Sequence, residues 1–392
     1  MRIAYVCADP GVPVFGQKGA SVHVQEVLRV LVARGHDVTL YCTRLGGTAP
    51  AGVQGVRVRS LAPGCADDLA GREASARRAA VALQRRVVDE GPWDLVYERY
   101  SLWSRAAADR ADADPRAAGT PSLLEVNAPL VQEQALHRGL VDRAGAEAVA
   151  RDALASATAV TAVSEPVGRW ARSAGAAPDA VHVLPNGVDT ERIRPSARPP
   201  RPFTVGFVGT LKPWHGTAVL VDAFAGLAAS DPTARLRLVG HGPQAEALAR
   251  QSRDLGLAQR VELVGGVAPE LVPAALRDFD VAVAPYDDPE QDYFSPLKVF
   301  EYLAAGLPVV ASDVGQLREL LDVDGEPAGL LVPPGDPAAL RQALCVLAQD
   351  PALRHRLGNR ARRLAVQRHR WEHVVDRALE LALARPPVEV AG

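Results

Sequence analysis

The sequence predicts an α/β protein with two domains, each built on a parallel sheet. Short apolar runs rich in β-branched residues alternate with longer helical patterns along the chain, as in a series of β-α-β units. The length of 392 residues exceeds one ordinary core and fits two domains. Four prolines gather within 192–202, where they disfavour both helix and strand and predict a linker. We therefore expect domains over 1–195 and 196–370.

The apolar runs locate the strands of both domains. The strands expected in the first domain are 2–7, 38–43, 56–60, 94–97, 122–127, 158–163 and 181–184. Those of the second are 203–208, 235–239, 261–264, 280–284, 308–312 and 329–332. Both series predict Rossmann-like sheets, which bind ligands beyond the carboxyl ends of their strands, and two such sheets facing one another make a deep inter-domain cleft.

The last segment, about 371–385, predicts an amphipathic helix that packs back on the first domain. Its apolar residues lie broadly on one face and are Trp371, Val374, Val375, Ala378, Leu379 and Leu381.

Composition excludes several classes of function. The net charge is −2, from 44 basic and 46 acidic side chains, so no nucleic-acid partner is expected. The four cysteines lack CxxC spacing and predict structural thiols in a reducing cytoplasm. Residues 1–7 have a strand pattern instead of a signal peptide, and no apolar run reaches the roughly 18 residues of a membrane span. We expect a cytoplasmic protein; peripheral membrane contact stays open but is not predicted.

The loop after the first strand is rich in glycine. Gly16 and Gly19 allow the backbone to approach a ligand, and Ser21 is expected to cap the following helix, whose free N–H groups would hold anionic oxygen. The alternative is a simple tight turn, because the spacing matches neither a dinucleotide fingerprint nor a P-loop.

Residues 293–312 carry the strongest pattern. Ser295 is expected to be the N-cap and Pro296 the first helical residue. Gly306 is expected to end the helix in the left-handed conformation, before Pro308 leads into the next strand.

The start of this helix predicts a diphosphate anchor. The N–H groups of Leu297 and Lys298 lack helical acceptors and lie at a positive dipole end, close to the Lys298 ammonium. Glu301, about one turn deeper, is placed to accept hydrogen bonds from two vicinal hydroxyls such as those of a ribose. The alternative for Lys298 and Glu301 is an i,i+3 surface salt bridge.

The chain resembles the retaining glycosyltransferases of the GT-B class that are grouped as family four, the glycosyl transferases group 1. The resemblance spans nearly the whole length, and several matches in the family's order are more specific than any one of them. Besides 293–312, it rests on Gly16–His23, Leu124–Pro129, Leu184–Asp189, Phe207–Gly216 and Val239–Pro243.

The resemblance implies how the second domain binds a nucleotide sugar. Lys212 and His215 would bind the pyrophosphate and Glu301 the ribose, while the loop that ends at Val267 would line the base pocket. Many members have a glutamate where this chain has Tyr293, so a contact between that carboxylate and the donor sugar is not assumed.

In the first domain, the resemblance assigns the turn from Gly16 through Gly19 to Ala20 to the donor phosphate and the transferred sugar, through backbone amides. Members often carry a histidine where this chain has Asn127, which can donate to a sugar oxygen but cannot act as a base. Glu125 points the same way along its strand, so it either reaches the site or is a structural carboxylate.

Four other features have plainer explanations. Asp112–Asp114 and Asp322–Asp324 have the DxD pattern of metal-binding glycosyltransferases of another fold, but both lie in predicted turns, and no metal site is expected. The basic segment Arg354–Arg363 is either a lipid-docking helix or, as we favour, an ordinary solvated face. His23 either contacts substrate or packs in the core.

The expected activity is transfer of a sugar, with retention, from a UDP- or GDP-linked donor to a hydroxyl of a small-molecule, glycan or lipid-linked acceptor, without a cofactor or a metal. Lys212, Lys298, Asn127 and Gly19 are the expected catalytic residues; Ser295 and Leu297 join the donor-binding set. Two alternatives are a nucleotide-sugar 2-epimerase and a non-catalytic nucleotide-sugar-binding partner of another enzyme. The richness in Ala and Arg suggests a high-GC bacterium.

Overall fold

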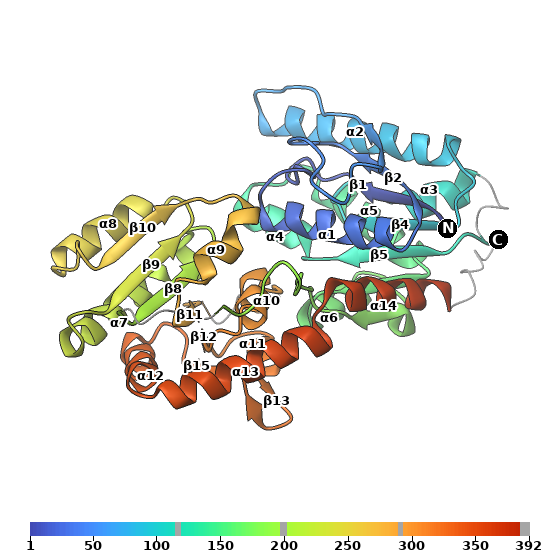
Figure 1. Cartoon of the computed structure of the whole chain (residues 1–392). Coiled ribbons are helices and arrows are strands. Elements are labelled where there is room, and N and C mark those ends of the chain that lie inside the picture. Colours follow the sequence, from blue (N-terminus) through green and yellow to red (C-terminus); the bar gives the residue numbers. More distant parts are fainter. Residues whose placement is uncertain (114–118, 197–201, 289–292, 385–392) are drawn as a thin grey trace. The chain divides into compact units, whose positions relative to one another are not determined.

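The computed structural model describes residues 1–113, 119–196, 202–288 and 293–384, and the chain divides into two compact units (Figure 1). Unit 1 comprises Met1–Pro185 and the C-terminal segment from Trp371, and unit 2 comprises Asn186–Arg370. The observed division falls after Pro185, whereas the sequence predicted the boundary after residue 195, within the proline-rich segment. The reason is that 186–195 is bonded to unit 2, for example by Val188 N–H, which donates to His369 O at 2.7 Å.

Unit 1 is a doubly wound α/β sandwich with a parallel sheet in the order β3-β2-β1-β4-β5-β6-β7. Its strands are β1 (Arg2–Cys7), β2 (Asp37–Cys42), β3 (Arg57–Ser60), β4 (Leu95–Arg99), β5 (Ser122–Val126), β6 (Ala159–Ala162) and β7 (Val181–Val183). Its helices are α1 (Gly19–Ala33), α2 (Leu69–Asp89), α3 (Ala106–Ala113), α4 (Leu130–His137), α5 (Arg143–Ser156), α6 (Glu165–Ser173), the 3₁₀ turn η2 (Pro178–Ala180) and α14 (Trp371–Leu383). The strand order steps outward in both directions from β1, which is the Rossmann-like arrangement.

Unit 2 repeats this plan with a parallel sheet in the order β10-β9-β8-β11-β12-β15. Its strands are β8 (Thr204–Val208), β9 (Arg235–Val239), β10 (Val261–Gly265), β11 (Val281–Ala284), β12 (Val309–Ser312) and β15 (Gly329–Val332), with a small hairpin of β13 (Asp322–Val323) and β14 (Glu326–Pro327). Its helices are α7 (Thr217–Ser230), α8 (Ala245–Asp254), α9 (Val272–Leu276), α10 (Leu297–Ala304), α11 (Leu317–Leu321), α12 (Pro337–Gln349) and α13 (Pro351–Arg368), with 3₁₀ turns η3 (Pro213–His215) and η4 (Pro269–Leu271).

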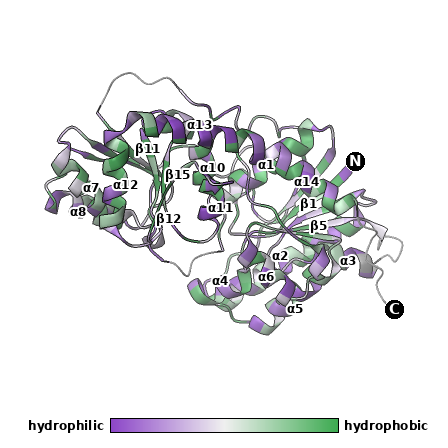
Figure 2. Cartoon of the chain, turned by 90° about the horizontal axis from the view of Figure 1, so that it is seen from below, coloured by the Kyte–Doolittle hydropathy of each residue, from purple (hydrophilic) through white to green (hydrophobic). Residues whose placement is uncertain are grey.

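Both faces of the unit 2 sheet are buried, which explains why its strands appear in the sequence as continuous apolar runs. Val281, Val283 and Val310 belong to one core cluster, whereas the alternating residues Ala282 and Ala311 belong to the other. The hydrophilic sides of the surrounding helices face outward, as on α13 (Figure 2). The sequence therefore predicted the fold class and the position of every strand of the two large sheets to within two residues, and the α/β fold with two Rossmann-like domains is confirmed.

The C-terminal helix α14 belongs to unit 1, where it packs against α1 and β5. Trp371, Val375, Ala378 and Leu379 are buried as the apolar pattern predicts, whereas Val374 and Leu381 are only half-buried, and Ala382 is buried instead. An ion pair between Arg34, at the end of α1, and Asp376, in the middle of α14, joins the two helices at the surface. Among the described residues, no helix has the length and apolar character that crossing a membrane requires.

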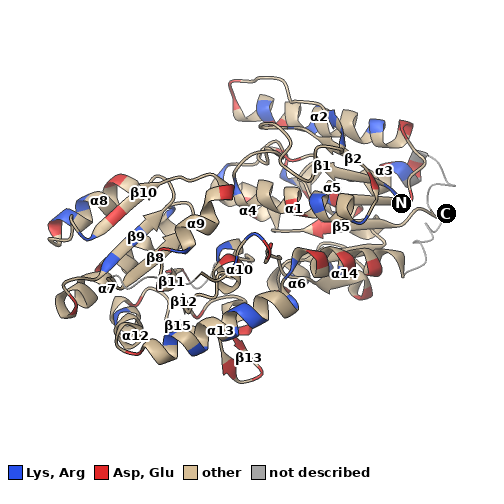
Figure 3. Cartoon of the chain, viewed as in Figure 1, with Lys and Arg blue, Asp and Glu red and all other residues tan. Residues whose placement is uncertain are grey.

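The basic helix α13 (Figure 3) uses several of its arginines inside unit 2. Arg362 donates to the carbonyls of Thr190, Ile193 and Ala304 at 2.9–3.0 Å, so it joins the segment after the unit boundary to the end of α10. Arg354 donates to the carbonyls that end α12. These contacts are intramolecular and structural, so only some of the basic residues of this helix belong to a solvated face.

Close backbone packing fixes the loop that follows β8. Gly216 has a φ of +61°, and a β-carbon added there would lie 1.5 Å from the Pro285 carbonyl oxygen. Gly256 has a similar φ of +70°, but a β-carbon there would meet nothing within 4 Å. The two glycines therefore differ in steric surroundings and share the same backbone conformation.

We expect Gly216→Ala to destabilise the protein by about 3 kcal/mol. The alanine must adopt the strained left-handed conformation, and its β-carbon must also displace the Pro285 backbone. The matched control Gly256→Ala carries only the strain, about 1 kcal/mol. Equilibrium urea unfolding of both variants measures the difference. Equal losses would contradict the close approach of Gly216 to Pro285.

Candidate active site

The carboxyl ends of the unit 2 strands carry the loops that the sequence singled out. The loop after β8 lies against the loop after β9: Leu211 N–H donates to His241 O at 2.9 Å, and a β-carbon on Gly240 would lie 1.8 Å from Gly209 O. Only glycine permits this approach, which draws the 209–216 loop over the ends of the strands. Contacts between backbone atoms thus join the two loops at this edge.

Lys298 lies in the first turn of α10 with its ammonium group buried. Its Nζ atom has no hydrogen-bond partner among the described residues, Glu301 included. Instead, Nζ lies 4.3 Å from the ring centre of Phe207 and 5.2 Å from that of Tyr286. Burial lowers the pKa of Lys298 to about 7, although Glu301 opposes the shift. An unpartnered buried cation is poised to pair with an anion.

His215 and Lys212 occupy the turn η3 and its start, beside Lys298. The Nδ1–H of His215 donates to the Thr210 carbonyl, and burial together with the charges of Lys298 and Lys212 lowers the His215 pKa to about 3. The ring is therefore neutral and contributes no positive charge at this edge. Lys212 is half-buried, with its Nζ 5.4 Å from the ring of Trp214.

The start of α10 differs from the sequence-based prediction. The helix begins at Leu297 with Pro296 as the N-cap, and Ser295 makes no capping hydrogen bond. The Ser295 hydroxyl instead accepts a hydrogen bond from the backbone N–H of Asn186 at 3.1 Å. The predicted N-cap was wrong because its hydroxyl is engaged by a residue 109 positions away in the chain.

The other predicted donor-binding residues lie on the same side of unit 2. Leu297 and Glu301 are half-buried on α10. At the other end of this helix, Gly306 has the predicted left-handed φ of +65°. Val267 follows β10 and packs partly on the core cluster that includes Tyr286. The aromatic residues Phe207 and Tyr286 were not predicted, although each lies at or just beyond a strand end, where the sequence places ligand contacts.

In unit 1, the glycine-rich loop is more ordered by its own contacts than the sequence suggested. Gly16 N–H donates to Pro13 O at 2.8 Å, so this amide is engaged in a turn. Gly19 is the first residue of α1, and Ala20 follows in its first turn. Ser21 is not the N-cap: its side chain is fully buried inside the helix, and its hydroxyl has no hydrogen-bond partner among the described residues.

A buried carboxylate organises the centre of unit 1. Glu125 on β5 is 5% exposed and accepts hydrogen bonds from Tyr97 Oη at 2.8 Å, Arg99 Nη1 at 2.9 Å and Asn127 Nδ2 at 2.6 Å. His23 Nε2 lies 2.9 Å from the same carboxylate. Burial alone would raise the pKa of Glu125, but His23, Arg99 and Asn127 together hold it well below its usual range.

These contacts decide between the alternatives left open by the sequence. Glu125 is a buried structural carboxylate that orients Asn127, whose half-buried side chain keeps its amide oxygen for other partners. His23 is a core residue: it is 4% exposed and packs edge-on against Trp371, with ring centres 4.8 Å apart. Arg99 and Tyr97 were missed, although their alternation along β4 places them on the face of Glu125.

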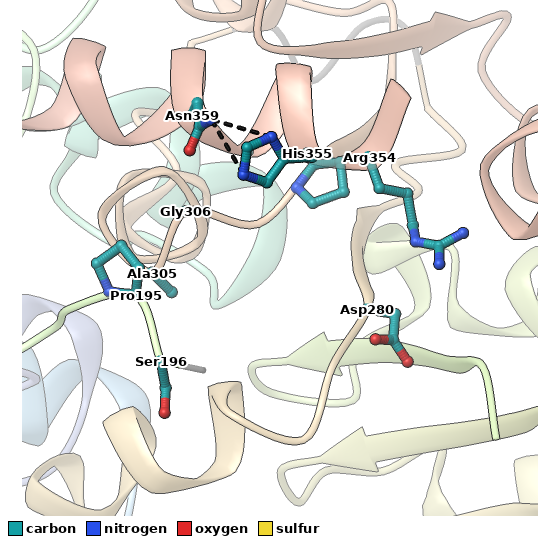
Figure 4. A pocket seen from close by; sticks show the side chains of 10 residues that line it. Pro195, Ser196, Asp280, Ala305, Gly306, Arg354, His355 and Asn359 are labelled. Carbon is teal, nitrogen blue, oxygen red and sulfur yellow. Dashed lines mark hydrogen bonds between the residues drawn. The ribbon is translucent and has the colours of Figure 1, made fainter. Parts of the chain in front are cut away.

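A pocket of about 410 Å³ lies in unit 2 at the opposite, amino-terminal edge of the sheet (Figure 4). Asp280 immediately precedes β11, and its carboxylate accepts the backbone N–H of Thr204 at 2.8 Å. Figure 4 shows His355 and Asn359 bonded to each other on α13, with N···N distances of 3.2 and 3.4 Å. Because ligands of such sheets bind at the carboxyl ends of the strands, this pocket is not the candidate site.

The DxD segments give no sign of a metal site. Asp324 has a φ of +59° in the β13–β14 hairpin, and its carboxylate pairs with Arg368 at 2.9 Å. Asp112 pairs with Arg105, while Asp114 lies outside the described residues. Within the described part of the chain, no group of three or more His, Cys, Asp or Glu side chains is arranged to hold a metal ion.

We expect Glu125→Gln to cost about 3 kcal/mol of unfolding free energy at pH 7, since it leaves Arg99 buried without its counter-ion. Because the folded pKa of Glu125 lies below its unfolded value, its contribution is present at neutral pH and is lost as pH falls below about 4.5. In urea unfolding between pH 3 and 7, the free energy of unfolding should therefore fall less steeply with decreasing pH for Glu125→Gln than for the wild type.

The control is Glu147→Gln, which removes an exposed partner of Arg143 on α5 and should cost no more than about 1 kcal/mol. A Glu125→Gln variant as stable as this control would rule out Glu125 as the organiser of the cluster.

Comparisons with known proteins agree with this architecture. Residues 17–192 match the family model Glycosyltransferase Family 4, and residues 202–350 match the model Glycosyl transferases group 1. The chain is 31% identical to the D-inositol 3-phosphate glycosyltransferase of Acidothermus cellulolyticus, over 94% of this chain and 85% of that protein. It is 35% identical to the phosphatidyl-myo-inositol mannosyltransferase of Mycobacterium leprae over 56% of this chain, and the match spans 57% of the length of that relative.

Among solved structures, Anabaena Alr3699/HepE in complex with UDP and glucose matches with a TM-score of 0.71 and 21% identity, over 97% of this chain and 98% of that chain. This likeness concerns the fold, which is GT-B. Together with the family models and the full-length relative, it leads to one conclusion. The chain belongs to glycosyltransferase family 4, the glycosyl transferases group 1, and is a glycosyltransferase.

Proposed function

We propose that the protein transfers a sugar, with retention of anomeric configuration, from a UDP- or GDP-linked donor to a hydroxyl group of a small-molecule, glycan or lipid-linked acceptor. The observation that carries the proposal is the buried, unpartnered ammonium of Lys298 at the start of α10. The first N–H groups of a helix also favour an anion, so this end of α10 suits a diphosphate. Anabaena HepE, which shares the fold, binds UDP in its crystal structure, and this supports a nucleoside diphosphate carrier.

In the proposed reaction, Lys298, Lys212 and the start of α10 stabilise the negative charge that develops on the departing diphosphate. The bond between the anomeric carbon and the phosphate oxygen breaks, and the acceptor oxygen bonds to the same face of that carbon. The acceptor proton passes to the departing phosphate oxygen, so the reaction requires no protein base, no cofactor and no metal. Asn127 and the Gly19–Ala20 amides would contact the transferred sugar, and Glu301 the ribose.

The test is a transfer assay with a panel of UDP- and GDP-sugars, with and without acceptors. The acceptor panel includes a cyclitol phosphate, because relatives are named as D-inositol 3-phosphate glycosyltransferases. We expect acceptor-dependent release of UDP or GDP that continues in excess EDTA, with a product whose anomeric proton signal in NMR matches that of the donor. An epimerised donor, or binding without turnover, would favour one of the two alternatives, and an inverted product would exclude retention.

The environment of Lys298 generates a pH-dependent prediction. With a pKa near 7 in the free protein, Lys298 is roughly nine-tenths uncharged at pH 8, whereas a bound diphosphate would hold it charged. We therefore expect binding of UDP or GDP at pH 8 to take up close to one proton, with the uptake falling toward pH 6. Calorimetry in buffers of different ionisation enthalpy measures it.

The matched variant is Lys298→Arg, since a guanidinium stays charged throughout this pH range and should bind without proton uptake. Equal uptake by this variant and the wild type would assign the proton to another group.

A further inference from the structure

The turn that precedes α10 is held by its carbonyl groups. Gln316 Nε2 donates to Phe294 O at 3.0 Å, and Asn186 Nδ2 donates to Ser295 O at 2.9 Å. The next carbonyl, that of Pro296, accepts the Val299 N–H at 2.9 Å. Three successive carbonyl groups are therefore engaged by donors within unit 2.

The two side chains that hold this turn are themselves fixed. Asn186 is 6% exposed and Gln316 is 8% exposed. Asn186 also donates its backbone N–H to the Ser295 hydroxyl at 3.1 Å. Two residues further on, Val188 forms a parallel bridge with Arg370, which anchors this stretch of chain within unit 2. Asn186 therefore holds Ser295 by two hydrogen bonds, and the chain next to Asn186 is itself anchored in unit 2.

Holding the carbonyls determines where the N–H groups point. In a trans peptide, the N–H and the C=O point in opposite directions, so the bond from Val299 N–H to Pro296 O also fixes the N–H of Leu297. Gln316 and Asn186 fix the two preceding peptide groups, through Phe294 O and Ser295 O, and so set where the helix begins. A free carbonyl near the same place would repel a phosphate, whereas an engaged carbonyl leaves only donors there. The orientation of the turn thus decides whether the start of α10 attracts an anion.

We propose that Asn186 and Gln316 are positioning residues for the donor diphosphate: they hold the 294–296 turn so that the first N–H groups of α10 and Lys298 face the phosphates. This inference rests on the proposed nucleotide-sugar donor. Neither side chain needs to touch the donor. Their contribution should therefore appear in the affinity for the phosphates and not in the affinity for the nucleoside.

The experiment compares Asn186→Asp and Gln316→Glu, which keep the shape of each side chain but replace the N–H donor by an oxygen that faces a carbonyl. Calorimetry measures the binding of UDP and uridine, and of GDP and guanosine. Asn359→Asp is the matched control, since Asn359 lies exposed on α13 at the opposite edge of the sheet. Thermal unfolding of each variant confirms that it is folded.

We expect each variant to weaken diphosphate binding by about tenfold relative to the control, as for the loss of one hydrogen bond that orients a charged site, with nucleoside binding unchanged. Asn186→Ser and Gln316→Asn keep a hydrogen-bond donor on a shorter side chain, so they should lose less diphosphate affinity than the acidic variants. They replace an acidic variant in the comparison if that variant does not fold. Equal weakening of diphosphate and nucleoside, or full diphosphate affinity in both variants, would overturn the positioning role. A wild-type protein that binds neither UDP nor GDP would instead overturn the proposed donor, and this inference with it.

Discussion

The direction of the peptide groups at the start of α10 is the constraint on which the proposed donor site of unit 2 depends. The first N–H groups of a helix have no acceptor within the helix. Here the side chains of Gln316 and Asn186 engage the preceding carbonyls of Phe294 and Ser295, so these oxygens are directed at donors of unit 2. Lys298 follows within the same turn, so its position depends on the same contacts. Catalysis by electrostatic preorganisation requires such fixed donors, because groups that must reorient in the reaction stabilise developing charge less well.

The two units treat buried charge in opposite ways. In unit 1, Glu125 is surrounded by donors from Tyr97, Arg99 and Asn127, and its charge is fully compensated. In unit 2, Lys298 Nζ faces aromatic rings and has no hydrogen-bond partner among the described residues. A satisfied buried ion specifies local structure, whereas an unsatisfied one costs stability unless a ligand completes it. This contrast distinguishes the structural carboxylate Glu125 from Lys298, for which we propose a binding role, although both appear in the sequence as single charged residues.

Local patterns predicted the strands and the turn at Gly306, because these follow from residue periodicity and from the conformational freedom of glycine. The caps at Ser295 and Ser21 were wrong for a different reason. Ser295 bonds to Asn186, which is distant in sequence, and Ser21 is buried in a helix that starts three residues earlier than a Ser21 cap would allow. The neutral state of His215 likewise depends on burial and on neighbouring lysines, which no spacing in the sequence reveals.

Charge density along a sequence is a poor guide to the surface that a helix presents. The segment 354–363 is strongly basic, yet Arg362 donates to three backbone carbonyls and Arg354 to the end of α12. An arginine that satisfies carbonyls at helix ends stabilises packing through several hydrogen bonds, and its charge is balanced by the C-terminal dipole of the helix that it meets. Since Arg362 meets α10 at Ala304, while Asn186 and Gln316 hold its beginning, the helix that carries Lys298 and Glu301 is restrained at both ends. The basic segment therefore fixes in unit 2 the helix that carries the proposed donor-binding residues.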